Sequence, residues 1–554
     1  MSTRKEEGIS RRKFITGAAV GAAALAGSAA LAGCNQSSSS SASSGSSGEK
    51  TDGIKWDEEA DVVVIGGGGA GLAAAISAAE ANGDAKILLL EKMSSLGGNS
   101  ALSGGNYGSC LTDVQLKQGE TNEAFAGDSF DLYYNEKRKL GDYRSIPEVT
   151  RVFIDNCLEG YKWLQGMGIV WGRVGTYEAP IPPPENPQGM RLQAMYNVDW
   201  TEGDWIGTMT KGRHHRDGVY KDFSSGGANI AAMVDRCGEH KNIELRTNSD
   251  VQQIIREGVL EGSVLGVVVG SGAQAKKIRA KKGVIMGSGG FTANGPMCTK
   301  YDSRLDPEGP NTGVSGVTGD ALLAAIDIGA DTMSMDHVQI RMQRSGVSYA
   351  NSIIIEGHGT YIDIDKEGNR FWKEMHDLAA YRYARLTVCY EKGLTSWWSI
   401  SDSKCIEANK LTEDAIAKNI ASGSSFKFDT FKELADKVGV PVDKLQATVD
   451  RYNSFVDSGV DLDFGQEKRY LKWKIDTPPF YAVPRRYYRQ HTMGGVVIDP
   501  NTANVKDRRG KLIPGLYAAG EALGGVHGVE RNGGCGWTEC IVFGRIAGKE
   551  CALR

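Results

Sequence analysis

The sequence predicts an α/β fold in which a discontinuous nucleotide-binding domain of the Rossmann type carries an inserted α+β domain. Two observations predict it. An apolar run at residues 61–65 leads into a glycine turn at 66–71, a helix and a second apolar run that ends at Glu91, which together form a βαβ unit. Two further apolar runs end in glycine turns far downstream, at 283–290 and 515–521. Strands of one sheet that lie so far apart in the chain leave room for a second domain between them.

The region before the first strand predicts export. Residues 10–14 read Ser-Arg-Arg-Lys-Phe, which is typical of a twin-arginine (Tat) signal, and an uncharged Ala/Gly-rich stretch follows. That stretch ends in Leu-Ala-Gly-Cys, which resembles a bacterial lipobox and makes Cys34 the candidate lipidation site; the alternative is a chance cysteine in an Ala/Gly-rich leader. We therefore expect a signal peptide at 1–34, a flexible serine-rich linker at 35–55, and an extracytoplasmic protein held at the cell membrane by a lipid anchor.

The βαβ unit predicts dinucleotide binding. Its glycines permit a tight turn and let a pyrophosphate approach the N-terminus of the helix, where the helix dipole favours an anion. Glu91 follows the last glycine of the turn by twenty residues and ends the second strand, where an acid accepts hydrogen bonds from a ribose. A lone glycine motif would be weak support, but here the strand, the helix, the spacing and the terminal acid all agree.

The composition excludes several other classes of protein. The chain has 554 residues and a formal net charge of −4, so no excess of basic residues indicates nucleic acid as a partner. Cys34 is one of ten cysteines, and the others show no CxxC or other ligand spacing. The sequence thus predicts no metal site, no covalent haem and no standard iron–sulfur cluster, while an iron–sulfur cluster with atypical spacing stays open.

Several segments carry a family resemblance. A second glycine-rich stretch lies at 96–105, and the segments Tyr-Ala-Ala-Gly-Glu at 517–521 and Phe-Gly-Arg-Ile-Ala-Gly at 543–548 follow much later. The most specific pieces are Gln-His-Thr-Met-Gly-Gly at 490–495 and Arg-Asn-Gly-Gly at 531–534. Together they resemble the FAD-containing flavoprotein family of fumarate reductase and succinate dehydrogenase, with the soluble, exported flavocytochrome-like branch as the nearest type.

The resemblance refines the expected fold to a discontinuous Rossmann-like FAD-binding domain with an inserted α+β capping domain. It places the first part of the FAD-binding domain at 56–338, the capping domain at 339–485 and the second part at 486–554. Gly98 stands where membrane-complex relatives carry the histidine that links the flavin covalently, so the resemblance implies non-covalent FAD. The expected FAD contacts are Gly66, Gly68, Gly69, Ala70, Gly71, Glu91, Lys92, Gly98, Asn99, Ser100, Ser103, Gly104, Gly105, Val251, Gly289 and Glu521.

The resemblance also implies the chemistry. Reduced flavin delivers a hydride to the β-carbon of an activated alkene while a side-chain acid protonates the neighbouring carbon. His491 and Arg531 match the family pair that grips a substrate carboxylate, and Thr492 follows in the same motif. The alternatives are that His491 is a core histidine whose ring nitrogens bond to backbone groups, and that Arg531 is a surface arginine.

On the far side of the substrate the chain departs from the family pattern. Arg341 stands where fumarate reductases use a histidine for the second carboxylate, and Ile353 and Glu356 stand where the family has the glutamate and arginine of its proton relay. The family's acid arginine aligns with Leu378, and Arg382, one helical turn later, is our candidate replacement. The rival acids are His376, Tyr381, Tyr487 and Tyr488.

These observations predict an extracytoplasmic FAD-dependent reductase of an activated C=C bond, in an α,β-unsaturated carboxylate or enone, as a terminal step of anaerobic respiration. The departures favour a substrate larger than fumarate, such as an aryl acrylate or a steroid-like compound. Because no haem motif is present, we expect a separate electron donor, which is a cytochrome, a flavoprotein or a quinol-linked protein. Two alternatives stay open: a ketosteroid-type FAD dehydrogenase that works in the oxidative direction, and a flavin-binding lipoprotein without catalysis.

Overall fold

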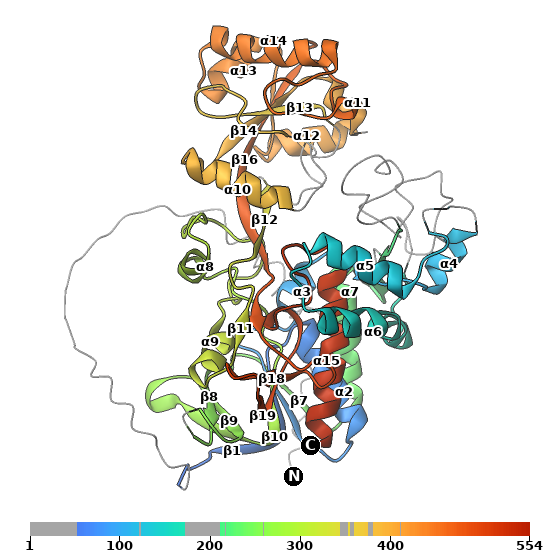
Figure 1. The fold of residues 1–554 in the computed structure, drawn as a ribbon, viewed down its shortest axis with the longest axis vertical. Helices are drawn as coiled ribbons and strands as arrows, with labels where there is room; N and C mark the ends of the chain where they lie inside the picture. The colour runs from blue at the N-terminus through green and yellow to red at the C-terminus, as the bar shows by residue number, and fades with distance from the viewer. Residues whose placement is uncertain are drawn as a thin grey trace, which may run out of the picture.

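A computed structural model of the protein describes residues 53–120, 123, 125–171, 211–215, 218–258, 260–343, 353–354, 359–374, 380–409 and 411–554, without the side chains of 342–343 and 380–384. The expected signal peptide, the lipidation site at Cys34 and nearly all of the expected linker lie outside these residues. Two bodies of unequal size follow one another along the long axis of the molecule (Figure 1). We call the smaller one, made of the described residues between 353 and 485, the upper body, and the remainder the lower body.

The lower body is built on an eight-stranded sheet in the order β18-β19-β10-β1-β2-β7, in which β9 pairs with β10 and β8 with β9. The strands β19, β10, β1, β2 and β7 run parallel. All four residues of β2 are buried, which explains the continuous apolar run: a parallel strand is covered on both faces. The strands are β1 (Glu58–Ile65), β2 (Ile87–Leu90), β7 (Ile243–Arg246), β8 (Val251–Arg256), β9 (Val264–Val269), β10 (Lys276–Met286), β18 (Asn504–Lys506) and β19 (Leu512–Ala518).

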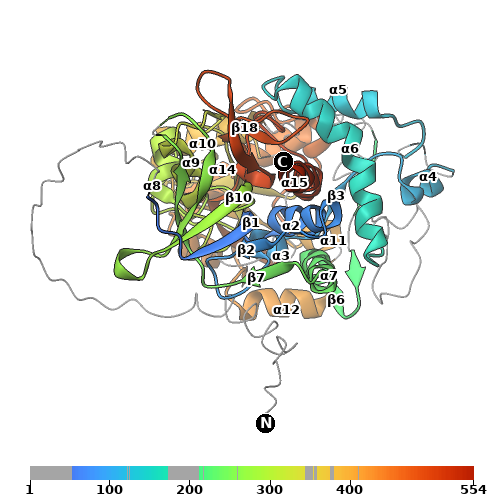
Figure 2. The ribbon, with the colours of Figure 1, turned by 90° about the horizontal axis from the view of Figure 1, so that it is seen from below.

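Helices from the two ends of the described chain meet on one face of this sheet. The last helix, α15 (Cys535–Leu553), packs along α2 (Gly69–Ala81), and the contact is so close that a Cβ atom on Gly548 would lie 2.2 Å from the carbonyl oxygen of Ala74. Figure 2 shows α7 on the same side of the sheet and α9 on the other. The remaining helices of the lower body are α3 (Gly98–Leu102), α4 (Asp113–Gly119), α5 (Phe130–Leu140), α6 (Pro147–Gly166), α7 (Ser225–Glu239), α8 (Gly295–Tyr301) and α9 (Asp320–Asp327).

One long strand connects the bodies. β16 (Phe480–Thr492) pairs with β14 and β15 through its first residues and with β12 through its last ones, so a five-stranded sheet in the order β12-β16-β14-β13 extends from one body into the other (Figure 1). The other elements of this region are β12 (Val338–Gln343), β13 (Tyr361–Ile364), β14 (Trp397–Ser401), β15 (Phe426–Phe428), α10 (Ala380–Glu391), α11 (Lys404–Ala408), α12 (Glu413–Ala421), α13 (Phe431–Val438) and α14 (Val442–Ser458).

Short strand pairs and 3-10 turns complete the fold. The pairs are β3 (Tyr107–Gly108) with β4 (His214–His215), β5 (Val219–Tyr220) with β6 (Phe223–Ser224), and β11 (Thr332–Met333) with β17 (Gly495–Val496). The 3-10 turns are η2 (Gly272–Gln274), η4 (Lys468–Tyr470) and η5 (Gly520–Ala522).

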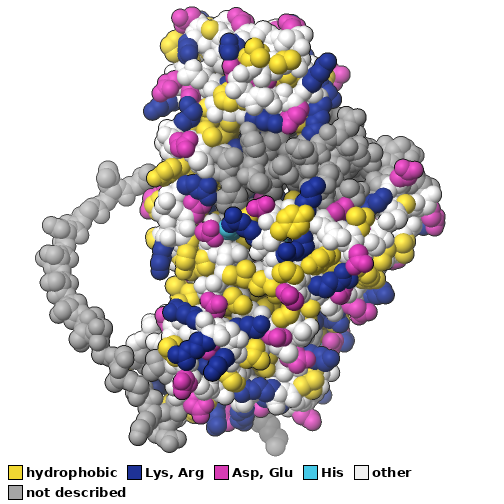
Figure 3. Space-filling view, in the orientation of Figure 1, with side chains coloured by type: hydrophobic (Ala, Val, Ile, Leu, Met, Phe, Trp, Pro, Cys, Tyr) yellow, Lys and Arg dark blue, Asp and Glu magenta, His cyan; other side chains and the backbone are white. Residues whose placement is uncertain are grey.

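The predicted α/β class is confirmed, because strands from both ends of the chain form one mostly parallel sheet. The domain boundaries at 338/339 and 485/486 stay a prediction. In the part of the chain that the structure describes, no helix combines the length and the apolar character needed to cross a membrane. On the face shown in Figure 3, acidic and basic side chains are interspersed over both bodies.

Candidate active site

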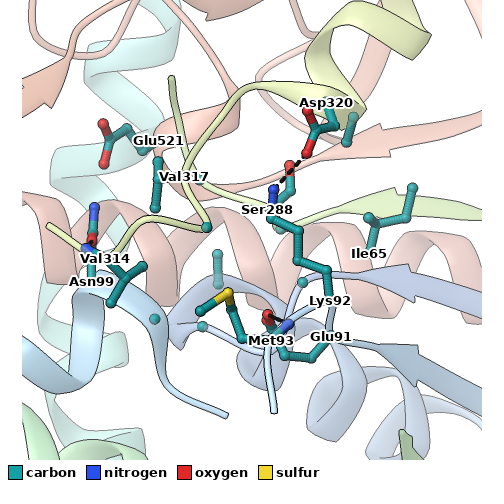
Figure 4. A pocket seen from close by; sticks show the side chains of 18 of the residues that line it. Ile65, Glu91, Lys92, Met93, Asn99, Ser288, Val314, Val317, Asp320 and Glu521 are labelled. Atoms are coloured by element: carbon teal, nitrogen blue, oxygen red, sulfur yellow. Dashed lines mark hydrogen bonds and ion pairs between the residues drawn. The ribbon is translucent and has the colours of Figure 1, made fainter. Parts of the chain in front are cut away.

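A cavity opens at the carboxyl ends of β1, β2 and β10, directly above the glycine turn (Figure 4). Its empty volume is about 850 Å³, including the part that is open to solvent. The walls come from segments far apart in the sequence, which is where an open parallel sheet binds its ligands. Of the expected FAD contacts, the cavity is lined by Gly66, Gly68, Gly69, Ala70, Glu91, Lys92, Gly98, Asn99, Ser100, Val251, Gly289 and Glu521.

The turn before α2 depends on glycine at two positions. Gly66 has a φ of +101°, and a Cβ atom there would lie 2.6 Å from the carbonyl oxygen of Gly287. A Cβ atom on Gly71 would lie 1.8 Å from the carbonyl oxygen of Gly66. The backbone therefore turns tightly and brings the N-terminus of α2 to the cavity, where the partial positive charge of the helix suits a pyrophosphate.

Glu91 is held rigidly at the end of β2. Its Oε2 accepts a hydrogen bond from the backbone N–H of Gly67 at 2.7 Å, and its Oε1 accepts one from the N–H of Met93 at 2.8 Å. A carboxylate fixed in this way at the cavity wall still has lone pairs that can accept from the hydroxyls of a ribose. The chemistry of these donors and acceptors fits a dinucleotide.

Two other expected contacts are engaged with the protein as well. The Nζ of Lys92 lies 2.5 Å from Asp320 Oδ2 and 2.6 Å from Thr318 Oγ1, so this lysine braces the wall of the cavity (Figure 4). Asn99 Oδ1 accepts a hydrogen bond from the backbone N–H of Val314 at 2.8 Å, which ties the start of α3 to the opposite wall.

The stretch 103–105 does not line the cavity. Ser103 Oγ accepts from the indole N–H of Trp537 at 2.8 Å and donates to the carbonyl oxygen of Ser100 at 2.7 Å, and a Cβ atom on Gly105 would collide with the backbone of Ser225. Gly104 lies between Ser103 and Gly105 in the sequence, and Gly71 packs against Gly66 in the turn before α2. These four expected contacts stay predictions, and in this structure they pack the segments that surround the cavity.

Two residues expected at the substrate, His491 and Thr492, lie beyond one end of the cavity. Glu521, which lines the cavity, pairs through Oε2 with His491 Nδ1 at 3.1 Å, and its Oε1 accepts from the backbone N–H and the hydroxyl of Thr492 at 2.8 and 3.0 Å. Burial opposes ionisation of Glu521, but His491 and the Thr492 hydrogen bonds lower the pKa of the carboxyl. Burial lowers the pKa of His491 although Glu521 opposes this. The imidazole is thus neutral at pH 7 and donates its Nδ1–H to a carboxylate.

Arg531 lies next to this imidazole. A Cβ atom placed on Gly536, at the start of α15, would lie 3.4 Å from Arg531 Nη1 and 3.8 Å from His491 Cε1, so both groups border the same point. Within the described residues, His491 Nε2 and Arg531 Nε are buried and have no hydrogen-bond partner. Buried polar nitrogens without partners are costly, so two of them on neighbouring side chains indicate a place for a polar ligand.

The remaining expected catalytic residues are Arg341, Arg382 and the rival acids. Arg341 lies on β12 and its Nε donates to Gln490 Oε1 at 2.5 Å. Arg382 and Tyr381 belong to α10, but their side chains lie outside the described part, as do the residues His376, Leu378 and Glu356. Ile353 is fully buried, and the hydroxyl of Tyr487 accepts from the backbone N–H of Asp306 at 2.8 Å, while Tyr488 is buried on β16. The identity of the proton donor therefore stays a prediction.

The sequence analysis missed a group of buried polar side chains behind His491. Lys137 on α5, His527 after η5 and Glu539 on α15 lie there, and Gln339 on β12 donates to the carbonyl oxygen of Arg531 at 3.3 Å. The one available signal was that Lys137 and Glu539 are charged residues at positions where the helix pattern is apolar.

Comparison with known proteins identifies the family. A family model described as "FAD binding domain" matches residues 61–537. The chain belongs to this FAD-binding family. It is 30% identical over 502 residues to the fumarate reductase (cytochrome) of Shewanella frigidimarina, which covers 89% of this chain and 77% of that protein. It is 27% identical to the digoxin reductase of Eggerthella lenta over 99% of this chain and 97% of that protein.

Other matches agree on the class of enzyme. The structure of the open conformation of a flavocytochrome c3 fumarate reductase has a TM-score of 0.69 and 25% identity, and the match covers 100% of this chain and 82% of that chain. Acrylate and urocanate reductases are also among the relatives. The chain spans about half the length of NADH:fumarate oxidoreductase from Klebsiella pneumoniae (strain 342), of which it covers 48%. Its relatives include fumarate, acrylate and urocanate reductases, and this chain is an FAD-dependent oxidoreductase that acts on C=C bonds.

Proposed function

We propose that this protein is an extracytoplasmic reductase that uses non-covalently bound FAD to saturate an activated C=C bond in an α,β-unsaturated carboxylate or enone. The observation that carries the proposal is the pair of buried, unpartnered nitrogens, His491 Nε2 and Arg531 Nε, beside the Glu521 end of the FAD cavity. A Cβ atom on Gly98 would meet nothing within 4 Å, so the position at which relatives attach the flavin is a glycine beside open space. This supports FAD held by contacts alone.

The side chains of Arg531 and His491 polarise the carbonyl or carboxylate group of the substrate. Reduced FAD, when bound, provides a hydride for the β-carbon of the alkene. Negative charge then accumulates on the carbonyl or carboxylate oxygens of the substrate, and donors fixed in a dry pocket stabilise it strongly. Arg531 provides a permanent cation, and His491 points one nitrogen at Glu521 and leaves the other for the substrate. Glu521, held in turn by Thr492, fixes the orientation of the imidazole.

A substrate larger than fumarate accounts best for the far side of the site. Arg341 is bonded to Gln490, and the buried Ile353 stands at a position where the resemblance implies a charged relay residue. A second carboxylate would thus lose one of its expected partners, whereas an aryl acrylate or a steroid-like enone needs none. The match to a digoxin reductase along nearly the whole chain supports this choice.

The proposed location and electron supply rest on the sequence. The Tat-type motif at 10–14 and the lipobox that ends at Cys34 support export and a lipid anchor, which would place the protein at a terminal step of anaerobic respiration. The absence of a haem motif from the sequence supports a separate donor, which is a cytochrome, a flavoprotein or a quinol-linked protein.

An anaerobic assay tests the proposal. Purified holoenzyme is mixed with dithionite-reduced methyl viologen and a panel that contains fumarate, aryl acrylates and steroid enones. We expect one aryl acrylate or enone to reoxidise the viologen faster than fumarate does. Reduction of a phenazine dye by a saturated ketosteroid would instead support the dehydrogenase, and bound flavin without either activity would support the flavin-binding lipoprotein.

A further inference from the structure

Three polar side chains from separate elements are buried together behind His491, and the proposed function does not use them. Lys137 comes from α5, His527 from the loop after η5 and Glu539 from α15, and each is at most 2% exposed. Burying a lysine and a glutamate is expensive, so a group of this kind needs either tight pairing or a task.

The three side chains form a directional chain of hydrogen bonds. Lys137 Nζ lies 2.7 Å from His527 Nδ1, and His527 Nε2 lies 3.0 Å from Glu539 Oε2. A lysine ammonium can only donate, so Nδ1 is the acceptor, and the remaining ring proton on Nε2 is donated to Glu539. A proton that enters at Lys137 can therefore leave at Glu539.

The chain ends beside the substrate-binding imidazole. One ring nitrogen of His491, one of His527 and one carboxylate oxygen of Glu539 all lie within 4.8 Å of one another, and the two rings are 5.9 Å apart between their centroids. His491 Nδ1 is engaged by Glu521, whereas Nε2 has no hydrogen-bond partner within the part of the chain described. A gap of at most 4.8 Å between these atoms can be crossed through one bridging water, so a proton can pass from Glu539 to the His491 ring.

The surrounding charges leave Glu539 protonated near neutral pH. Burial, opposed by Lys137 and Arg531 and reinforced by Glu521, raises the pKa of the Glu539 carboxyl to about 8. Burial also lowers the pKa of His527 well below its usual range, and Lys137, His491 and Arg531 lower it further.

Lys137 is the proton donor at the start of this chain of hydrogen bonds. Burial lowers the pKa of its ammonium, which Arg531 lowers further while Cys535 and Glu539 raise it. The ammonium lies 4.6 Å from the centroid of the Phe153 ring, which stabilises the cation, and Phe153 also packs edge-on against His527.

We propose that Lys137, His527 and Glu539 form a buried proton relay that supplies, through His491, the proton that accompanies the hydride in C=C reduction. This rests on the proposed function. The β-carbon gains a hydride, with its electron pair, from the reduced flavin, and the π bond becomes an enolate whose charge lies on the oxygen beside His491. The neutral ring of His491 carries its proton on Nδ1, so Nε2 first takes a proton from Glu539 and then passes it to the α-carbon of the enolate, which completes the saturated product. Lys137 refills Glu539 through His527, and one proton then enters from solvent.

The same three ligand atoms, from His491, His527 and Glu539, could in principle bind a divalent cation. The ammonium 2.7 Å from His527 and the guanidinium beside His491 oppose this, because both repel a cation. Elemental analysis of the purified holoenzyme decides the point. We expect no stoichiometric transition metal, and one equivalent that is lost in Glu539→Gln would overturn the relay.

Infrared spectroscopy tests the relay without any substrate. Difference spectra of the holoenzyme between pH 7 and pH 9 should show the C=O stretch of one protonated carboxylic acid, which disappears in Glu539→Gln and persists in the control Glu550→Gln on the same helix. Lys137→Met should shift the titration of this band to higher pH, because Lys137 lowers the pKa of Glu539. A band that is unchanged in Glu539→Gln, or a shift to lower pH in Lys137→Met, would overturn the proposal. The Lys137 variant keeps the test decisive if Glu539→Gln fails to fold.

A single-turnover measurement completes the test. With a substrate found in the viologen assay, Glu539→Gln should reoxidise the reduced flavin about a hundredfold more slowly at pH 7, with little change in the substrate concentration that gives half the maximal rate, as expected for loss of proton supply. An unchanged rate would overturn the relay while leaving the proposed reductase intact. If the viologen assay finds no substrate, the proposed function fails, and the infrared titration still reports whether Glu539 holds a proton.

Discussion

The surroundings of the FAD cavity and the upper body are stabilised in different ways. Around the FAD cavity the core is apolar, and many of the residues that line the cavity are glycines, as in the turn at Gly66. In the upper body the apolar clusters are small, and charged groups are buried among them. Arg370, for example, pairs with Glu374 Oε2 at 2.7 Å and with Asp461 Oδ2 at 3.0 Å, all three nearly inaccessible to solvent.

The difference separates two kinds of specificity. A wall rich in glycines brings the backbone close to the ligand, and this approach does not depend on side chains, so it suits a cofactor that never changes. A region held by pairs of buried charges fails when one partner is removed but can be rebuilt with other pairs, so such a region can differ between relatives.

The largest expected effect concerns the buried ion network of the upper body. Arg370→Ala leaves two buried carboxylates without their cation and should lower the free energy of unfolding by about 3 to 5 kcal/mol. Thermal unfolding followed by circular dichroism measures it, with Arg451→Ala as the control, because Arg451 makes an exposed pair with Asp463. Equal stability of the two variants would contradict the comparison, and we expect Arg370→Ala to keep its FAD.

The substrate pair should show the next largest effect. Arg531→Ala removes a donor at the developing negative charge, and His491→Ala removes the imidazole beside it, so turnover in each variant should fall at least about a hundredfold while FAD stays bound. Steady-state rates and the flavin absorbance of the purified variants measure both quantities, again with Arg451→Ala as the control. Wild-type rates in both variants would remove these residues from the mechanism.

A smaller loss is expected at the ribose end of the cavity. Glu91→Gln keeps the shape but turns an amide N–H₂ toward the backbone N–H of Gly67 or of Met93, and it removes a charged acceptor. FAD affinity should fall by about ten- to a hundredfold, which corresponds to about 1.5 to 3 kcal/mol for a hydrogen bond to a charged group. Flavin fluorescence on dilution measures the release. Glu244→Gln, which alters an exposed carboxylate on β7, should bind FAD like the wild type.

The smallest expected effect is a dependence of stability on pH. Burial and the nearby Glu374 raise the pKa of Asp363 to about 6, so the folded state binds a proton that the unfolded state has already released. Wild-type stability should therefore fall as the pH rises from about 3.8 to about 6. Relative to wild type, Asp363→Asn should gain a few degrees in Tm between pH 4 and pH 7, whereas exposed Asp436→Asn should not.

The sequence analysis succeeded where the physics is local. A strand, a glycine turn and an acid at the end of the next strand fix the geometry within a few tens of residues, so the turn at Gly66 and the place of Glu91 could be predicted. The placement of His491 and Arg531 side by side followed from two short motifs through the family resemblance. The glycines at 104–105 show the limit, because a glycine that admits a ligand and one that admits another backbone look alike in sequence.

The buried relay could not be predicted for a different reason. Lys137, His527 and Glu539 come from three elements that meet only in the folded chain, and none of the three lies in a recognisable spacing. Their burial depends on how α5 and α15 pack, which is a property of the whole lower body. The role of Arg382 remains a prediction because its side chain lies outside the described residues.

The strand β16 has thirteen residues, which at about 3.3 Å per residue amounts to about 40 Å of continuous backbone. Its first residue, Phe480, pairs with β15 in the upper body, and its last residue, Thr492, follows His491 in the lower body. Because the strand is long and continuous, a rotation of a few degrees at Phe480 displaces Thr492 by ångströms. The position of the His491 imidazole therefore depends on the strands that pair with the other end of β16, which are β14 and β15.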